Sequence, residues 1–137
     1  MKLVIDANIV MSCLVSGGVA ELVFSPHLEL AAPELLFDEI RKHKKEIIAK
    51  SWLSDAEVEL LLTLIEKQVS VFPRYTFEHL MPKAEKLLGK HVKDSPYIAL
   101  ALYLECPLWS YEKRFGNIHG IKVVDSSDVR DNLNELS

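Results

Sequence analysis

The amino-acid sequence predicts an α/β fold in which a short, twisted, mostly parallel sheet of about four to five strands carries helices on both faces. Short apolar segments recur along the chain without the polar alternation of a half-exposed strand, which is typical of parallel strands buried on both faces. The segments between them have the apolar spacing and the capping residues of helices. The length of 137 residues favours a single domain spanning residues 1–137.

Each expected element has its own signal in the sequence. Strands are predicted at residues 3–5, 28–32, 69–72, 108–110 and 122–124. A helix or irregular turn is expected at residues 8–15, and a short helix at residues 19–25. Pro33 suits the first position of a long helix that ends near residue 50, and Ser54 with Glu57 predicts a capping box for a helix reaching residue 68. Further helices are expected at residues 76–88 with a break at Pro82, at residues 95–105, and from Ser126 onward.

The composition excludes several classes of protein. Hydrophobic residues make up 49% of the chain, which rules out intrinsic disorder for most of it. A net charge of −4 excludes a broadly basic coat for nucleic acid, but a local site stays open because part of the negative charge lies in residues 125–137. Cys13 and Cys106 are expected to be buried thiols in a reducing compartment. The apolar runs are too short for a membrane helix, so a cytoplasmic protein without membrane contact is expected.

Four acidic residues fall at the carboxyl ends of predicted strands or in the helices behind the strands. Asp6 directly follows the first strand, and Glu39 lies on the border of the apolar face in the helix after the second strand. Asp94 stands at the start of a strongly apolar helix, and Glu112 follows the fourth strand, beside Ser110. In a parallel sheet these ends share one edge, where ligands bind. Each residue alone is also compatible with a structural role: a helix cap for Asp6 or Asp94, a boundary residue for Glu39, and a solvated loop acid for Glu112.

Acids gathered at one edge of a sheet have a specific chemistry. The carboxylates repel one another and need divalent cations in order to share a site. Ligands that offer oxygen alone suit Mg²⁺ or Mn²⁺. Such an ion, singly or in a pair about 4 Å apart, activates water and stabilises the leaving oxygen of a phosphodiester. The acidic set is therefore compatible with metal-dependent phosphodiester hydrolysis.

The ordered motifs resemble the PIN domain, the nuclease fold of VapC-type toxins and of RNA-processing proteins. The resemblance runs from Lys2 to about Asp125 and rests on LVIDAN at residues 3–8, Pro33 with Glu39, KDSPYIALAL at residues 93–102, and LWSYEKRF at residues 108–115. It implies a PIN-like three-layer sandwich and a metal-dependent endoribonuclease, and it is compatible with the VapC-type toxin of a toxin–antitoxin pair. It also implies three partners: RNA, a second copy in a homodimer, and a small antitoxin protein.

The resemblance assigns a role to each acidic position. Asp6, Glu39 and Asp94 match the first three acids of the family and would be metal ligands. Asp6 and Asp94 would most directly hold the ion that positions the attacking water. Glu112 matches the fourth acid, usually Asp, and with Glu39 would complete or orient the shell of the metal. The supporting polar positions of the family are matched by Asn8 and Ser110.

Basic residues flank the acidic set and are typical either of a solvated face or of contacts to RNA phosphates. The hypothesis of RNA contact concerns Arg41, Lys42, Lys45, Lys90, Lys93 and Arg114. Arg114 also replaces an acid that many members of the family carry, which leaves the number of bound ions open at one or two. Trp52 and Trp109 are expected to pack in the core rather than to stack on bases, and residues 60–64 to serve either a dimer or the core.

Two alternatives to an active ribonuclease stay open. One is a PIN-like module with weak catalysis that would bind RNA or protein in RNA processing. It is suggested by Glu112 and Arg114, which depart from the usual acids of the family. A phosphoryl-transfer hydrolase with Asp6 as the nucleophile is suggested by the sequence Asp6-Ala7-Asn8 after a strand, but it gives no role to Glu39 or to residues 94–96.

Overall fold

One parallel sheet forms the centre of the protein. The computed structural model describes residues 1–89, 92–112 and 120–136. Within these residues the sheet has 5 strands in the order β3-β2-β1-β4-β5, and every neighbouring pair is parallel. The strands are β1 (Lys2–Ile5), β2 (Glu29–Pro33), β3 (Val69–Phe72), β4 (Leu108–Trp109) and β5 (Val123–Val124). The carboxyl ends of all strands therefore point to the same edge, and the prediction of a short parallel sheet is confirmed.

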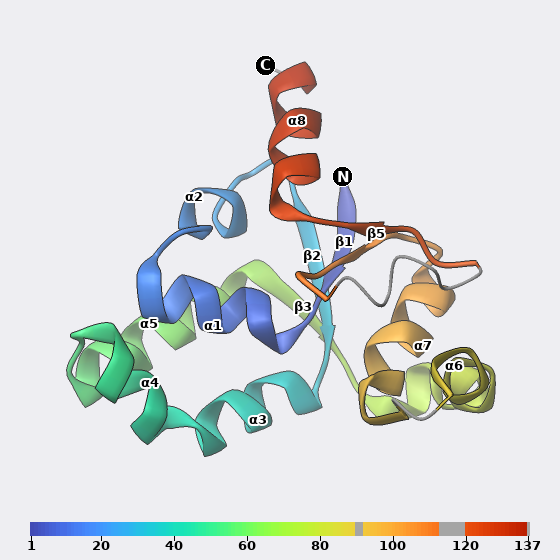
Figure 1. Ribbon diagram of the computed structural model, residues 1–137, viewed down its shortest axis with the longest axis horizontal. Coiled ribbons are helices and arrows are strands. Elements are labelled where there is room, and N and C mark those ends of the chain that lie inside the picture. Colours follow the sequence, from blue (N-terminus) through green and yellow to red (C-terminus); the bar gives the residue numbers. More distant parts are fainter. Residues whose placement is uncertain (90–91, 113–119, 137) are drawn as a thin grey trace.

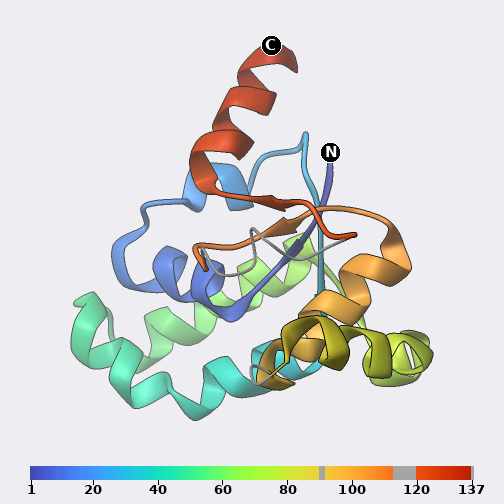
Figure 2. The same cartoon turned by 45° about the vertical axis from the view of Figure 1, so that its right-hand side comes forward.

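Helices cover both faces of the sheet and make a three-layer arrangement (Figures 1 and 2). One side carries α1 (Ala7–Ser16), α3 (Leu35–Lys42), α4 (Lys44–Ser51) and α5 (Asp55–Gln68), and the other carries α6 (Met81–Leu88) and α7 (Ser95–Leu104). The short α2 (Ala20–Val23) and the final α8 (Ser126–Leu136) lie toward the top of Figure 1, where Arg130 of α8 donates hydrogen bonds to Glu21 of α2. Three 3₁₀ turns complete the described chain, at Arg74–Thr76, Glu78–Leu80 and Val92–Asp94.

Burial explains why these strands carry no polar alternation. Leu3, Val4 and Ile5 of β1 are fully buried, because α7 packs on β1 and β2 from one side while α1 and α5 lie on the other. The apolar run Ile98–Ala101 of α7 is buried in turn. A parallel sheet covered in this way needs apolar residues on both faces of each strand.

The capping box predicted for α5 is present. Ser54 Oγ accepts a hydrogen bond from the backbone N–H of Glu57 at 3.1 Å, and Glu57 Oε1 accepts one from the backbone N–H of Ser54 at 3.0 Å. These reciprocal bonds satisfy two donors that the first turn of a helix leaves without a helical partner. The helix therefore begins where the sequence places it.

The prediction of one long helix from Pro33 to residue 50 is wrong. Pro33 is the last residue of β2 and pairs with Phe72 of β3, beyond the residues of β2 that pair with β1, so its missing N–H removes no hydrogen bond between β1 and β2. The helical segment is then divided at His43, whose backbone (φ −101°, ψ 15°) separates α3 from α4. The break predicted at Pro82 lies directly before it, because the 3₁₀ turn Glu78–Leu80 ends there and Pro82 stands in the first turn of α6, where a proline is tolerated.

The two tryptophans have opposite environments. Trp109 in β4 is fully buried, as expected, whereas Trp52 is 99% exposed and the expectation of core packing is wrong. Trp52 ends α4 in the left-handed backbone region (φ 64°), which turns the chain toward α5 and leaves the ring outside. Leu60 and Leu64 of α5 are also exposed, which excludes the core for these two residues.

The cysteines follow the prediction in part. Cys13 is buried and Cys106 is partly exposed, and neither forms a disulfide within the described residues. None of the helices in the described part of the chain has the length and apolarity needed to cross a membrane.

Candidate active site

Asp6 and Ser110 meet because their strands are neighbours in register. Ile5 of β1 lies opposite Trp109 of β4, so the next residue of each chain segment reaches the same carboxyl edge. Ser110 Oγ donates a hydrogen bond to Asp6 Oδ2, and the exposed fractions of the two residues are 3% and 7%. Asp6 Oδ1 accepts a hydrogen bond from the backbone N–H of Ile9 at 3.3 Å and so caps α1. The capping role of Asp6 and a role in the site are therefore compatible.

The buried carboxyl group of Asp6 is electrostatically unfavourable as an anion. Burial raises the pKa of Asp6 above its ordinary value, and the negative charge of Asp94 adds to the rise. The hydrogen bonds from Ser110 and from the backbone N–H groups of Ile9 and Asn8 oppose the rise but do not cancel it. A cation beside Asp6 would favour the ionised form, because opposite charges lower the pKa of a carboxyl group.

Ser110 also connects Asp6 to the segment that carries Glu112. Ser110 Oγ accepts a hydrogen bond from the backbone N–H of Glu112 at 3.0 Å. A serine hydroxyl that bonds the backbone two residues further on holds the chain in a turn. The turn keeps Glu112, which is half-buried, at the edge of the sheet where Asp6 lies.

Glu39 and Asp94 come to this region from opposite sides of the sheet. Glu39 is half-buried in α3, beside the buried side chains of Leu36 and Ile40. Asp94 is half-buried and stands directly before α7. Its side chain makes no capping hydrogen bond with that helix in the part of the chain that the structure describes. The first turn of α7 therefore does not account for the place of Asp94.

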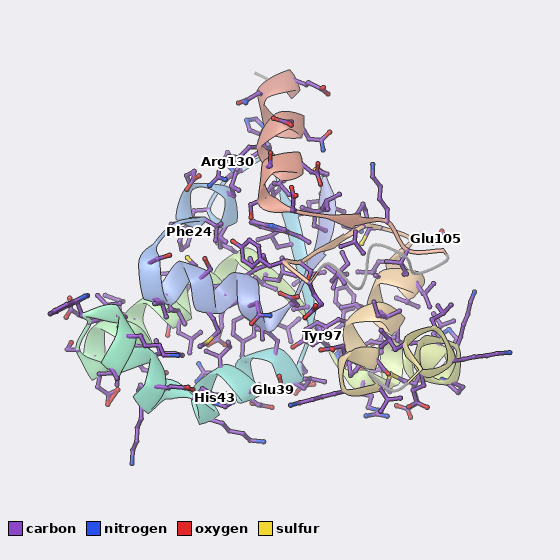
Figure 3. All side chains as sticks on the ribbon, in the orientation of Figure 1. Phe24, Glu39, His43, Tyr97, Glu105 and Arg130 are labelled. Atoms are coloured by element: carbon purple, nitrogen blue, oxygen red, sulfur yellow. The ribbon has the colours of Figure 1, made fainter. Side chains whose placement is uncertain are left out.

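The buried phenol of Tyr97 in α7 is influenced electrostatically by three of the acids. Its side chain is 4% exposed. Burial raises the pKa of the phenol, and the negative charges of Glu39, Asp6 and Asp94 raise it further. In Figure 3, Tyr97 projects from α7 toward α3, the helix that carries Glu39. Tyr97 was not predicted as a site residue, because it lies in an apolar run typical of a core helix.

A groove of about 240 Å³ lies beside the acidic residues, between α1 and the pair α3 and α4. Asn8, Met11, Glu39 and His43 are among the residues that line it. The sequence predicted Asn8 and Glu39 but not Met11 or His43, since a methionine in a helix and a histidine in a basic run carry no catalytic signal of their own. Glu39 forms part of the wall of this groove.

The family follows from comparison of the whole chain with known proteins. The family profile described as the PIN domain matches residues 4–134. The chain belongs to the PIN domain family. This PIN domain has no match among the curated proteins with which it was compared.

Two solved structures share the fold of this PIN domain. The structure of VapBC2 from Rickettsia felis, bound to a DNA fragment from their promoter, aligns with a TM-score of 0.69 and 9% identity. The structure of VapBC-1 from nontypeable Haemophilus influenzae aligns with a TM-score of 0.66 and 20% identity. Each alignment covers 91% of this chain and 98% of the chain it is compared with. The predicted PIN-like α/β sandwich is thereby confirmed.

PIN domains are generally nucleases that use divalent metal ions, and the carboxylates of this site are of the right chemical type. Across the described ranges, however, no group of three or more His, Cys, Asp or Glu side chains is arranged closely enough to hold an ion. Mg²⁺ is usually bound through one or two carboxylates and keeps several of its waters. The donor set therefore fits a largely hydrated ion held by one or two acids better than a closed cage of protein ligands.

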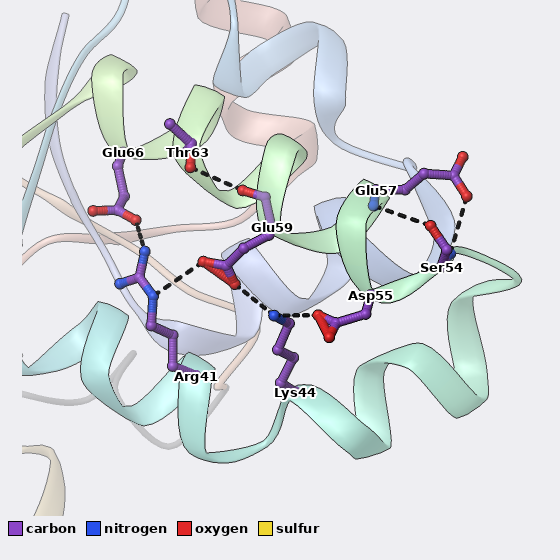
Figure 4. A network of polar contacts seen from close by, with 8 residues as sticks. All are labelled: Arg41, Lys44, Ser54, Asp55, Glu57, Glu59, Thr63 and Glu66. Atoms are coloured by element: carbon purple, nitrogen blue, oxygen red, sulfur yellow. Dashed lines mark hydrogen bonds and ion pairs between the residues drawn. The ribbon is translucent and has the colours of Figure 1, made fainter.

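The basic residues predicted to contact RNA differ in their surroundings. The guanidinium of Arg41 is directed at α5 and donates to Glu66 and, at 3.5 Å, to Glu59 (Figure 4). A phosphate would have to compete with these two carboxylates, and whether Arg41 contacts RNA stays a prediction. Three of the other predicted residues are exposed: Lys42, Lys45 and Lys93. Lys90 and Arg114 lie outside the described residues.

Proposed function

We propose that this PIN domain is a Mg²⁺- or Mn²⁺-dependent endoribonuclease that hydrolyses RNA phosphodiester bonds. Its site would consist of the carboxylates of Asp6, Glu39, Asp94 and Glu112. The observation that carries the proposal is the electrostatic coupling of Asp6, Glu39 and Asp94 to the same buried phenol. Coupled carboxylates of like charge favour a divalent cation among them. Membership of a family of nucleases supports the choice of reaction.

We assign each residue of the site a role either in holding the metal ion or in orienting its ligands. Asp6 and Asp94 would hold the ion, and Glu39 and Glu112 would complete or orient its shell. The bound ion supplies an activated water and charge compensation for the phosphate. Ser110 and the backbone of Ile9 hold the two oxygens of Asp6, which fixes the orientation of this carboxylate before an ion binds. Asn8 supports Asp6 through its backbone N–H, which lowers the pKa of the carboxyl group.

We further propose that the protein is a VapC-type toxin that pairs with a small antitoxin protein. Its likeness to two structures of VapBC assemblies supports this role. The groove beside Glu39 offers a place where a partner segment would reach the site. The exposed Leu60 and Leu64 on α5 support a homodimer, because burying them between two copies removes apolar surface from water. Co-purification of a small protein and the mass of the purified protein in solution test these two partners.

Cleavage of a panel of structured RNAs in the presence of Mn²⁺ tests the proposed activity. We expect Asp6→Asn and Asp94→Asn each to lower the rate of cleavage by at least about 100-fold, and a chelator to abolish it. Asp38→Asn is the matched control, because Asp38 is an exposed acid adjacent to Glu39 in α3. Equal cleavage by the wild type and by both site variants would refute the proposal, since the activity would then come from elsewhere.

The binding module with weak catalysis stays as a second candidate. It is favoured by the lack, within the residues described, of three acids close enough to hold an ion. The same RNA panel distinguishes it from the enzyme: a wild type that binds RNA in a gel-shift assay but leaves it intact with both Mg²⁺ and Mn²⁺ supports the module.

A further inference from the structure

Tyr97 carries a buried hydroxyl group that the packing of the fold does not explain. Within the residues that the structure describes, its Oη has no hydrogen-bond partner. Even the exposed Tyr111 has hydrogen-bond partners, because its hydroxyl accepts from Ser126 Oγ at 3.3 Å and lies 3.5 Å from Ser12 Oγ. A phenylalanine at position 97 would fill the same apolar space without burying a polar atom. Since buried polar groups are nearly always hydrogen-bonded, the hydroxyl of Tyr97 calls for a partner other than the described residues of the chain.

The surroundings of Tyr97 restrict what this partner is. The following residues of α7, Ile98 to Ala101, are buried and apolar, and the charges that act on the phenol are those of the acids Asp6, Glu39 and Asp94. Three negative charges keep the phenol neutral and disfavour an anionic partner such as a phosphate. A water molecule is small enough to reach a buried site, and it requires two to four polar groups around it.

We propose that Tyr97 is a positioning residue of the metal site, whose hydroxyl oxygen accepts a hydrogen bond from a water of the divalent ion held beside Asp6 and Asp94. The inference rests on the metal site of the proposed function. An ion bound by one or two carboxylates keeps several waters. A water whose lone pair faces the cation directs its protons outward, toward acceptors such as a phenol oxygen. Tyr97 would thus fix the place of the hydrated ion without touching the ion itself.

Binding of Mn²⁺ measured by titration calorimetry tests this role without any RNA. We expect Tyr97→Phe to bind Mn²⁺ about three- to tenfold more weakly than the wild type, because one hydrogen bond to the hydrated ion is lost. Tyr103→Phe is the matched control, since Tyr103 lies in the same helix with 44% of its side chain exposed, and it should bind Mn²⁺ as the wild type does.

Thermal unfolding distinguishes a role of Tyr97 in metal binding from a purely structural role. Without metal, Tyr97→Phe should unfold at the same temperature as the wild type or higher, because the change removes a hydroxyl that pairs with no described group. The rise in unfolding temperature on adding Mn²⁺ should be smaller in Tyr97→Phe than in the wild type.

Several outcomes decide between the inference and the proposed function. Unchanged Mn²⁺ affinity in Tyr97→Phe overturns the inference and leaves the nuclease proposal standing. A lower unfolding temperature without metal, together with unchanged Mn²⁺ affinity, also overturns it, because the hydroxyl would then be held by the protein. A wild type that binds Mn²⁺ but cleaves no RNA overturns the nuclease and not the role of Tyr97. A wild type that binds no Mn²⁺ overturns both.

Discussion

Ser110→Ala perturbs the site at the point where the sheet holds its buried carboxylate. The change removes the hydroxyl that donates to Asp6 Oδ2 and accepts from the backbone N–H of Glu112. Both Ser110 and Asp6 are buried, so water cannot readily replace the lost partner. A hydrogen bond to a charged group contributes about 1.5 to 3 kcal/mol, and we expect the free energy of unfolding at neutral pH to fall by about 2 to 3 kcal/mol.

The loss of unfolding free energy in Ser110→Ala should become smaller as the pH falls. The bond from Ser110 favours the ionised form of Asp6 and lowers its pKa, so its stabilisation is present above that pKa and disappears as the carboxyl group is protonated. Because burial holds the folded-state pKa above 3.8, the difference between wild type and Ser110→Ala should shrink as the pH falls through a range above this value. The variant should also need a higher pH for cleavage, since Asp6 loses a group that lowers its pKa.

Urea unfolding followed by the fluorescence of the buried Trp109 measures the effect at neutral pH and at successively lower pH. Ser16→Ala is the matched control, because Ser16 also makes two hydrogen bonds through its hydroxyl but is exposed, and its loss should stay within about 0.5 kcal/mol. Two results would contradict the stabilising role of the bond from Ser110 to Asp6. One is a loss of unfolding free energy in Ser110→Ala below about 0.5 kcal/mol, and the other is a loss that is the same at every pH.

Two further predictions concern the surface. Lys93→Ala should weaken RNA binding and reduce the slope of log affinity against log salt by about 0.7, because one phosphate contact to a single strand is lost. Lys67→Ala on α5 should leave the slope unchanged, and equal slopes in all three proteins would refute the contact. Trp52→Gly should raise the free energy of unfolding by up to about 1 kcal/mol, because a left-handed backbone is strained for residues with a β-carbon while glycine adopts it readily. A fall in the unfolding temperature of Trp52→Gly would show that the exposed ring makes a contribution which its 99% exposure does not suggest.

Local signals predicted the elements whose boundaries depend on neighbouring residues. The apolar run before Asp6 indicated a buried strand, and Ser54 with Glu57 indicated the start of α5, because a capping box is complete within four residues. The same reasoning failed at Pro33, where a proline that is acceptable at the start of a helix instead ends β2. The choice depends on pairing with β3, some forty residues further along the chain, and no local pattern reports that pairing.

The candidate site was predictable in its members more than in its arrangement. The rule that parallel strands end at one edge places Asp6 and Ser110 together, and the register of β1 with β4 brings their side chains into contact. The joint effect of Glu39 and Asp94 on the phenol of Tyr97 was not predictable, because it depends on α3 and α7 packing from opposite faces of the sheet. The same limit applies to Arg41, whose basic character favoured RNA contact although its guanidinium is paired with acids of α5.

The sequence by itself determined the class of the protein: an α/β sheet of buried parallel strands, a PIN-type order of acidic residues, and Asp6 at the edge where ligands bind. These features follow from periodicity, capping and the order of residues, which act over a few positions. The tertiary structure alone decided that Trp52 is outside, and that the buried hydroxyl of Tyr97 pairs with no described group while the charges of three acids act on the phenol. Burial and electrostatic coupling depend on which distant elements pack together, so they become visible when the helices are placed on the sheet.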